Sequence, residues 1–251
     1  MNTLIFSAGA KGGTGKSRAI ELITSYLRVN GCIPHLIDMD DESRTLYRMF
    51  PEAEKVNARD PRNPYTQDKL LDSFYKDGHK LVIADLKAGV GEDTLRWWDK
   101  IEFDDCPDIK FICIGSITSN ADSVTSFLTW ANSLRERVSY IIFKNEKDGV
   151  IFPIYDNSIE VLKFQEQFHP FHVNIEEVPK EFMHEIDRLN LTFEEILQAS
   201  KEGKSKYNGK DIGDVFTSKS KVMHIRSFRN KVFAQLDKVD LFQEIISEHK
   251  K

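Results

Sequence analysis

Lys11-Gly12-Gly13-Thr14-Gly15-Lys16-Ser17 is a glycine-rich stretch between a short apolar run and a helix-like segment. Glycines let the backbone fold tightly enough for several N–H groups to point at one phosphate, and a helix N-terminus adds a favourable dipole. In such a loop the second lysine reaches the β- and γ-phosphates, and the hydroxyl after it ligates Mg²⁺. The stretch therefore predicts a nucleoside triphosphate site in which residues 12–17 surround the phosphates, with Lys16 on the phosphate chain and Ser17 on the metal.

The chain around this loop alternates between short apolar runs and helical patterns. The runs are rich in β-branched and aromatic residues and apolar on both faces, as buried parallel strands require. They cover residues 4–6, 33–37, 81–84, 109–114, 140–143 and 171–175. Because helical periodicity over residues 17–29 and 120–136 separates them, the sequence predicts an α/β fold with a doubly wound, mostly parallel sheet flanked by helices.

Three segments depart from this alternation. Residues 51–66 carry three prolines and predict a long loop, whereas residues 201–213 predict a mobile basic loop. A last helical pattern over residues 219–248 predicts a helical C-terminal cap. We therefore expect a single domain over residues 1–251, on which a basic helical region, residues 201–251, packs.

Composition excludes several classes of protein. The chain has 251 residues, 40% of them hydrophobic and 30% charged, which is enough to bury a full core. Its three widely spaced cysteines predict neither a disulfide framework nor a zinc site. The N-terminus lacks the basic region of a secretory signal, and no run of about 18 apolar residues occurs. We expect a cytoplasmic protein with no membrane partner.

Acidic residues stand where two of the predicted strands end. Asp38 and Asp40 follow the second apolar run, and Asp85 follows the third. In phosphoryl transfer, carboxylates at strand ends can hold a Mg²⁺-bound water or position the attacking water. The alternative for Asp40 is an acidic, solvated rim of the sheet, and the alternative for Asp85 is a structural aspartate.

The phosphate loop departs from the ordinary motif in one informative way. Ala10 stands where glycine is usual, and a second lysine, Lys11, precedes the paired glycines. This loop resembles the deviant Walker A loop of the ParA/MinD family of partitioning and positioning ATPases. In that family the extra lysine crosses a nucleotide-sandwich dimer and touches the partner's phosphates. The resemblance therefore implies a trans-acting role for Lys11.

The first acidic segment is also similar to that family. Residues 38–43 read Asp-Met-Asp-Asp-Glu-Ser, beside the family's Asp-x-Asp-Pro-Gln-x-Ser, so both acids match while proline and glutamine do not. The resemblance implies that Asp40 orients the hydrolytic water. It also implies that Asp38 supports either the loop or the metal.

The second acidic segment has the Walker B form, a hydrophobic strand that ends in Asp85. The resemblance implies a place for Asp85 in the metal shell. The family continues Asp-x-Pro-x-Gly, but Lys87 and Ala88 stand here where prolines are usual, while Gly89 is kept. Lys87 could bind the γ-phosphate or could indicate altered switching, and both readings stay open.

Two further features concern ligands. Asn145 lies just beyond the fifth run, where the resembling family uses an asparagine to hydrogen-bond adenine; a turn-forming asparagine is the alternative. Residues 201–231 contain nine Lys or Arg against three Asp or Glu. Such a basic region suits non-specific binding to DNA phosphates, as in ParA-like proteins, or is a solvated helix face. The candidate DNA-binding residues are Lys219, Lys221, Arg226, Arg229 and Lys231.

The resemblance implies a slow ATPase that requires ATP and Mg²⁺, forms a homodimer with ATP, binds DNA in that state and responds to a stimulating partner protein. Small plasmid partition or stability ATPases are the nearest description. Two alternatives remain. One is a small-molecule kinase or ligase with the same fold, and the other is a nucleotide-binding regulator with little hydrolysis.

Overall fold

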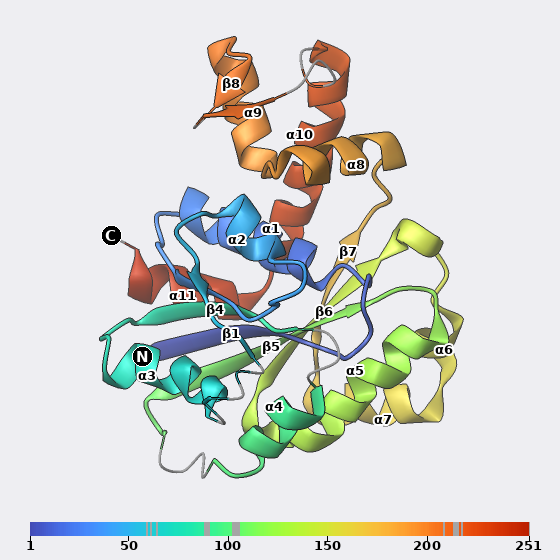
Figure 1. The fold of residues 1–251 in the computed structure, drawn as a ribbon. Coiled ribbons are helices and arrows are strands. Elements are labelled where there is room, and N and C mark those ends of the chain that lie inside the picture. The colour runs from blue at the N-terminus through green and yellow to red at the C-terminus, as the bar shows by residue number, and fades with distance from the viewer. Residues whose placement is uncertain are drawn as a thin grey trace.

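The computed structural model describes residues 1–250 except 59, 61, 64, 88–90, 102–105, 208, 213–215 and 217. Among them, seven strands form one sheet in the order β3-β2-β4-β1-β5-β6-β7, and all neighbouring strands are parallel. The strands are β1 (Asn2–Ala8), β2 (His35–Asp38), β3 (Glu54–Lys55), β4 (Leu81–Asp85), β5 (Ile109–Ile117), β6 (Ser139–Asn145) and β7 (Phe171–Ile175). The sheet grows outward on both sides of β1, which confirms the predicted doubly wound α/β fold (Figure 1).

Helices cover both faces of this sheet (Figure 1). They are α1 (Lys16–Val29), α2 (Thr45–Met49), α3 (Lys69–Tyr75), α4 (Gly91–Trp98), α5 (Ala121–Leu134), α6 (Pro153–Asn157), α7 (Ile159–Phe168), α8 (Lys180–Leu189), α9 (Phe193–Glu202), α10 (Lys219–Leu236) and α11 (Asp240–His249). α1, α2, α10 and α11 lie over one face, and α3 to α7 lie over the other.

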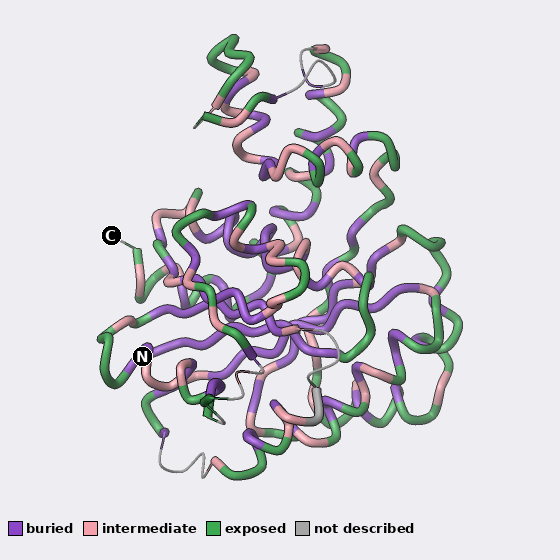
Figure 2. The backbone as a smooth tube through the Cα atoms, viewed as in Figure 1, coloured by how far each residue is buried: buried purple, intermediate pink, exposed green. Residues whose placement is uncertain are grey.

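Each face of the sheet has its own apolar core. β1 is buried along its whole length, and a strand sends alternate side chains to opposite sides. Ile5 accordingly belongs to the core under α1, whereas Leu4 and Phe6 belong to the core under α5. The central strands are buried on both sides in Figure 2. This burial explains why the strands read as continuous apolar runs.

The C-terminal elements form a group that stands above the sheet (Figure 1). It contains α8, α9, the hairpin of β8 (Lys206–Tyr207) and β9 (Lys210–Asp211), and the first turns of α10. α10 joins this group to α1, because Phe228 contacts Phe193 of α9 at a centroid distance of 4.9 Å and Phe233 contacts Tyr26 of α1 at 5.3 Å.

In the first half of the chain, the structure differs from the predicted strands at two places. β2 begins at His35 and not at Ile33, whose side chain is exposed, since Pro34 has no N–H to donate to a ladder. The segment predicted as a long loop contains β3, in which Glu54 pairs with Ile37 of β2. Tertiary pairing created a strand too short to leave a periodic signal.

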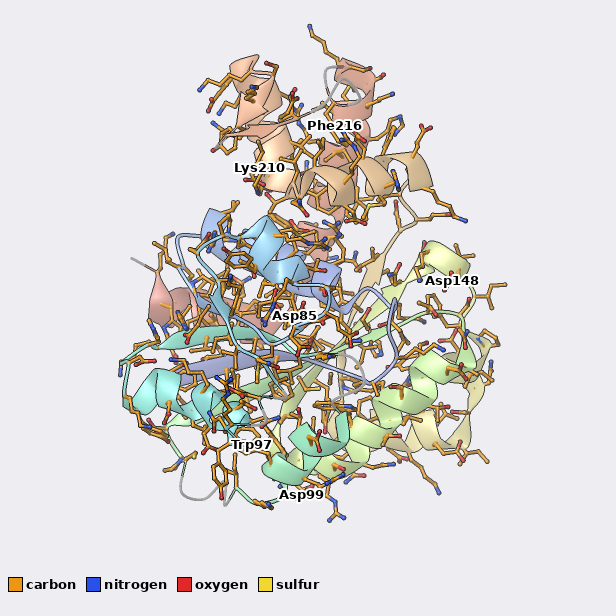
Figure 3. The ribbon with its side chains drawn as sticks, in the orientation of Figure 1. Asp85, Trp97, Asp99, Asp148, Lys210 and Phe216 are labelled. Carbon is orange, nitrogen blue, oxygen red and sulfur yellow. The ribbon has the colours of Figure 1, made fainter. Side chains whose placement is uncertain are left out.

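The basic segment over residues 201–213 was predicted wrongly as a mobile loop. Among its described residues, α9 continues to Glu202 and the β8–β9 hairpin follows. The Lys210 ammonium holds the hairpin in place. It donates to both carboxylate oxygens of Glu195 at 3.1 Å and to the carbonyls of Met49 and Asn190. Figure 3 shows Lys210 beneath the hairpin, on the side facing α2.

The final helical pattern is two helices and not one. α10 ends at Leu236, and α11 begins at Asp240. Between them, Asp237 accepts a hydrogen bond from the Tyr26 hydroxyl at 2.8 Å, and the ring of Phe242 then packs on Tyr26. The break turns α11 back onto α1, so the cap covers the sheet and does not extend from it. Within the described ranges, no helix is long and apolar enough to cross a bilayer.

Candidate nucleotide-binding site

The glycine-rich loop lies at the carboxyl edge of the sheet, between β1 and α1. Two side chains from neighbouring strands hold it from behind: Ser116 Oγ donates to the Thr14 carbonyl at 2.9 Å, and Asn145 Nδ2 donates to it at 3.0 Å. Gly15 has φ of 101°, and a Cβ there would lie 2.4 Å from Asn145 Nδ2. Glycine is therefore required at this position by both conformation and space.

Lys16 begins α1 and points back into its own loop. Its ammonium donates to the Lys11 carbonyl at 2.7 Å, and the side chain is buried. Burial lowers the pKa of Lys16, while the charges of Asp85 and Asp40 oppose that shift. A buried cation held by one carbonyl is well placed to exchange that oxygen for a phosphate oxygen.

Asp85 ends β4 directly beside the loop, in the centre of the molecule (Figure 3). Its Oδ1 accepts from Ser7 Oγ at 3.0 Å, whereas its Oδ2 is buried and accepts no hydrogen bond of normal geometry. Burial raises the pKa of Asp85 to about 6, although the nearby Ser17 hydroxyl favours the carboxylate. A buried, unsatisfied carboxylate oxygen beside a serine hydroxyl fits a Mg²⁺ ion or one of its waters.

Asp38 stands level with Asp85 on the adjacent strand, but its oxygens are already used. Oδ1 accepts from the Asp40 N–H at 3.0 Å and Oδ2 from the Tyr47 N–H at 2.8 Å. Arg44 lies nearby and donates to the Asp38 carbonyl at 2.6 Å. These contacts tie Asp38 to the segment that follows β2, and its role toward the loop or the metal stays a prediction.

Asp40 closes a tight turn after β2. Its Oδ2 accepts from Ser43 Oγ at 2.7 Å, and its Oδ1 accepts from the N–H groups of Glu42 and Ser43. Although burial opposes it, these hydrogen bonds hold the pKa of Asp40 below its usual value. The carboxylate is an anion that faces the cavity described below. Both of its oxygens accept hydrogen bonds from the turn.

Lys11 is exposed at the tip of the loop. Its ammonium lies 3.1 Å from Asp122 Oδ2 in the first turn of α5, and its N–H donates to Ser126 Oγ at 3.0 Å. The lysine is thus held by its own chain, at the edge of the cavity.

One cavity of about 710 Å³ lies against the loop and is lined by Lys16, Ser17 and Asp40. It begins at Gly12, Lys16 and Ser17 and extends beyond the phosphate loop toward β7 and α8. Its far end has an apolar wall of Ile175, Val178, Met183 and Phe228. Sequence reasoning missed this wall, because nothing local marks residues from β7, α8 and α10 as neighbours of the loop.

Asn145 lines the same cavity, but both ends of its amide are engaged. Besides the bond to Thr14, its Oδ1 accepts from the Lys147 N–H at 3.2 Å. The hydrogen bond from the Lys147 N–H is the one expected of a turn-forming asparagine. The hydrogen bond to the Thr14 carbonyl supports the phosphate loop. Contact with adenine stays a prediction. Ala88 and Gly89, part of the altered segment after Asp85, lie outside the described residues.

Comparison with solved structures relates this architecture to known proteins. The septum site-determining protein MinD of Pyrococcus horikoshii, complexed with Mg-ADP, matches with a TM-score of 0.55 and 14% identity over 96% of this chain and 98% of that one. MinD of Aquifex aeolicus matches with a TM-score of 0.50 and 14% identity over 92% and 97%. The chain has the MinD fold.

A plasmid partition protein from Borrelia burgdorferi matches less closely, with a TM-score of 0.43 and 13% identity over 70% of this chain and 90% of that one. No protein-family model matches the chain. No curated protein matches it either. The MinD fold accounts for the place of the phosphate loop, Asp40 and Asp85 at one edge of the sheet.

The candidate DNA-binding residues all lie on α10 of this fold, but they do not form one open stripe. Arg229 Nε lies 2.8 Å from Glu194 Oε1, and the Lys231 ammonium lies 2.7 Å from Glu176 Oε2. Lys221 lies over the Phe182 ring. Lys219 and Arg226 are exposed. Acids that follow β7 and lie on α9 therefore neutralise part of the predicted basic region. DNA binding stays a prediction.

Proposed function

We propose that this protein is a Mg²⁺-dependent ATPase that works as a ParA-like molecular switch. The observation that carries the proposal is that Lys16 and Ser17 line one cavity large enough for a nucleotide, with the unsatisfied Oδ2 of the buried Asp85 close to the Ser17 hydroxyl. The MinD fold, in a relative complexed with Mg-ADP, supports the same site.

Each group has a defined task in binding. The N–H groups of the glycine-rich loop and the Lys16 ammonium hold the phosphates, while Ser116 and Asn145 fix the loop through the Thr14 carbonyl. Ser17 and Asp85 would hold Mg²⁺, which supplies charge neutralisation for the transferring phosphoryl group. The apolar wall beside α8 suits the face of a base.

Hydrolysis requires Asp40 to leave its turn. In the arrangement described, Ser43 Oγ and two N–H groups occupy its oxygens, so the carboxylate cannot orient a water until the loop opens. Binding of a second protomer or of a partner protein could drive that opening. The turn around Asp40 supports the proposal of a slow ATPase that a partner stimulates.

The output of the switch is a dimer that forms with ATP. Lys11 is exposed at the cavity edge, where it can exchange Asp122 for the phosphates of a partner protomer. In the dimer, two copies of α10 would present Lys219 and Arg226 together, which is a route to weak, non-specific DNA binding.

One set of measurements tests this function. ATP hydrolysis is measured with and without DNA, together with mass by light scattering with ATP, for the wild type and Asp40→Ala. We expect ATP-dependent dimers in both proteins and turnover only in the wild type. Lys16→Ala should abolish nucleotide binding, and retained affinity would defeat the site. Turnover that ignores DNA and needs a small acceptor would instead indicate a kinase or ligase.

A nucleotide-binding regulator with little hydrolysis is the second candidate. The satisfied carboxylate of Asp40 favours it, since a residue committed to its own turn contributes nothing to water activation. Tight ATP binding and dimerisation without turnover, under every partner and DNA condition tested, would establish this alternative.

A further inference from the structure

Lys87 connects the two acidic segments of the site. It lies two residues beyond Asp85, and its ammonium is 2.6 Å from Asp41 Oδ1 and 2.9 Å from Glu42 Oε1. Its side chain is only 11% exposed, which is rare for lysine unless the charge is paired. The ion pairs therefore hold the segment after β2 against the segment after β4.

The position of this lysine follows from the sheet. β2 and β4 are neighbours with Asp38 opposite Asp85, and the Met39 N–H donates to the Asp85 carbonyl at 3.0 Å. The two segments consequently leave the sheet side by side, at the mouth of the nucleotide cavity. Glu42 and Asp40 line that cavity, and the charge of Lys87 acts on Asp40.

The mouth of the cavity is strongly acidic. Asp40, Asp41 and Glu42 follow one another, and a triphosphate would bring more negative charge to the same place. Without a cation, repulsion among these anions would oppose ATP more than ADP, because only ATP carries the terminal phosphate. Lys16, Arg18, Lys147 and Lys180 line the cavity, and Lys87 is the cation that is paired with Asp41 and Glu42 themselves.

The two carboxylates that hold Lys87 differ in exposure. The Glu42 side chain is 78% exposed, so its ion pair contributes little to stability and the carboxylate can regain water. The Asp41 side chain is 22% exposed, so its pair with Lys87 is the stronger of the two. A phosphate dianion inside a cavity is a stronger partner for the ammonium than either carboxylate.

We propose that Lys87 is a specificity-determining residue that distinguishes ATP from ADP. Without nucleotide its ammonium holds Asp41 and Glu42, and with ATP it turns to the terminal phosphate and releases the loop that carries Asp40. The inference rests on the proposed nucleotide site and adds to it a third lysine, outside the glycine-rich loop. It also joins the two readings that the sequence left open for Lys87, since phosphate binding is itself the switching event.

The test is a comparison of dissociation constants for Mg-ATP and Mg-ADP by titration calorimetry. Lys87→Met keeps the aliphatic stem and removes the charge, so we expect ATP affinity to fall about tenfold, while ADP affinity changes less than about twofold. The double variant Asp41→Asn/Glu42→Gln removes the competing carboxylates and should tighten ATP selectively, by about threefold. These opposite signs would not arise from a merely structural ion pair. Lys87→Arg, which keeps the charge, should restore most of the preference for ATP.

Lys76→Met is the matched control, because Lys76 makes an equally short ion pair with Asp72 on α3, away from the cavity. It should leave both affinities unchanged. The proposal is overturned if Lys87→Met weakens ATP and ADP equally or affects neither, or if the double variant weakens ATP. A wild-type protein that binds neither nucleotide would overturn the proposed function itself.

Discussion

The Lys11 ammonium lies 3.1 Å from the Asp122 carboxylate, so the loop lysine that is expected to act across a dimer is held by the first turn of α5 in its own chain. Both side chains are about half exposed or more. The pair is therefore weak enough for a ligand or a second protomer to break.

Removing the acid from this pair should favour dimerisation. In Asp122→Asn the lysine is free before the second protomer arrives, so the ATP-dependent dimer should form with a dissociation constant about two- to fivefold lower, the range of an exposed ion pair. Sedimentation with saturating ATP measures it. Asp72→Asn, which breaks the exposed pair with Lys76, is the control. A weaker dimer in Asp122→Asn would show that the pair supports the active loop.

Gly15 and Gly13 should differ sharply when replaced by alanine. Gly15→Ala combines a φ of 101° with a contact of 2.4 Å to Asn145 Nδ2, whereas a Cβ on Gly13, at φ 71°, meets its nearest neighbour at 4.0 Å. We expect Gly15→Ala to lose roughly 2–4 kcal/mol of folding stability and at least tenfold in ATP affinity. Gly13→Ala should lose about half as much stability. Urea unfolding and nucleotide titration compare the two, and equal losses would argue against the clash.

Asp85 should make the nucleotide-free protein sensitive to pH. Burial raises the pKa of this carboxyl from its usual value of 3.8 to about 6. Because the folded-state pKa lies above the unfolded one, the stability that the protonated form contributes is complete below about pH 4 and is lost as pH rises through about 6.

The neutral variant Asp85→Asn removes this loss. It should unfold at a higher temperature than the wild type at pH 7.5, by an amount that corresponds to roughly 2–3 kcal/mol, and at a similar temperature below about pH 4. It should also lose Mg²⁺-dependent nucleotide binding. Thermal unfolding against pH, without metal, measures the first effect, with the exposed Asp99→Asn as control. A variant destabilised equally at every pH would refute this account of Asp85.

The helical cap should be integral to the fold. Phe242 of α11 is fully buried against Tyr26 of α1, at a ring distance of 5.7 Å. Phe242→Ala should therefore cost about 3–5 kcal/mol of unfolding free energy. Phe168→Ala, at a partly exposed ring on α7, should cost less. Similar losses in urea unfolding for the two variants would indicate that α11 is only loosely attached.

Much of the fold was predictable from the sequence. The apolar runs at residues 4–6, 81–84 and 171–175 fall within β1, β4 and β7, because a central parallel strand is buried on both faces and leaves a local signal. β3 left no such signal. β3 has only two residues and forms because it pairs with β2, so the strand propensity of its residues could not predict it.

The basic C-terminal region shows where sequence reasoning failed. Its charge suggested a mobile loop and a set of DNA-binding residues, yet Lys210 is fixed by Glu195 and Lys231 is paired with Glu176, 55 residues away. Local charge counting cannot include acids that the fold brings from other elements.

The sequence by itself determined the phosphate loop, most of the strands and the presence of acids at the strand ends, because glycine conformation and side-chain periodicity act over a few residues. Tertiary structure alone decided which acid keeps an unsatisfied oxygen. Both carboxylate oxygens of Asp38 accept a backbone N–H, whereas Oδ2 of Asp85 does not. Tertiary structure also decided that Lys87 meets Asp41 across 46 residues. Hydrogen bonds and ion pairs depend on distance in space, and only the folded chain sets that distance.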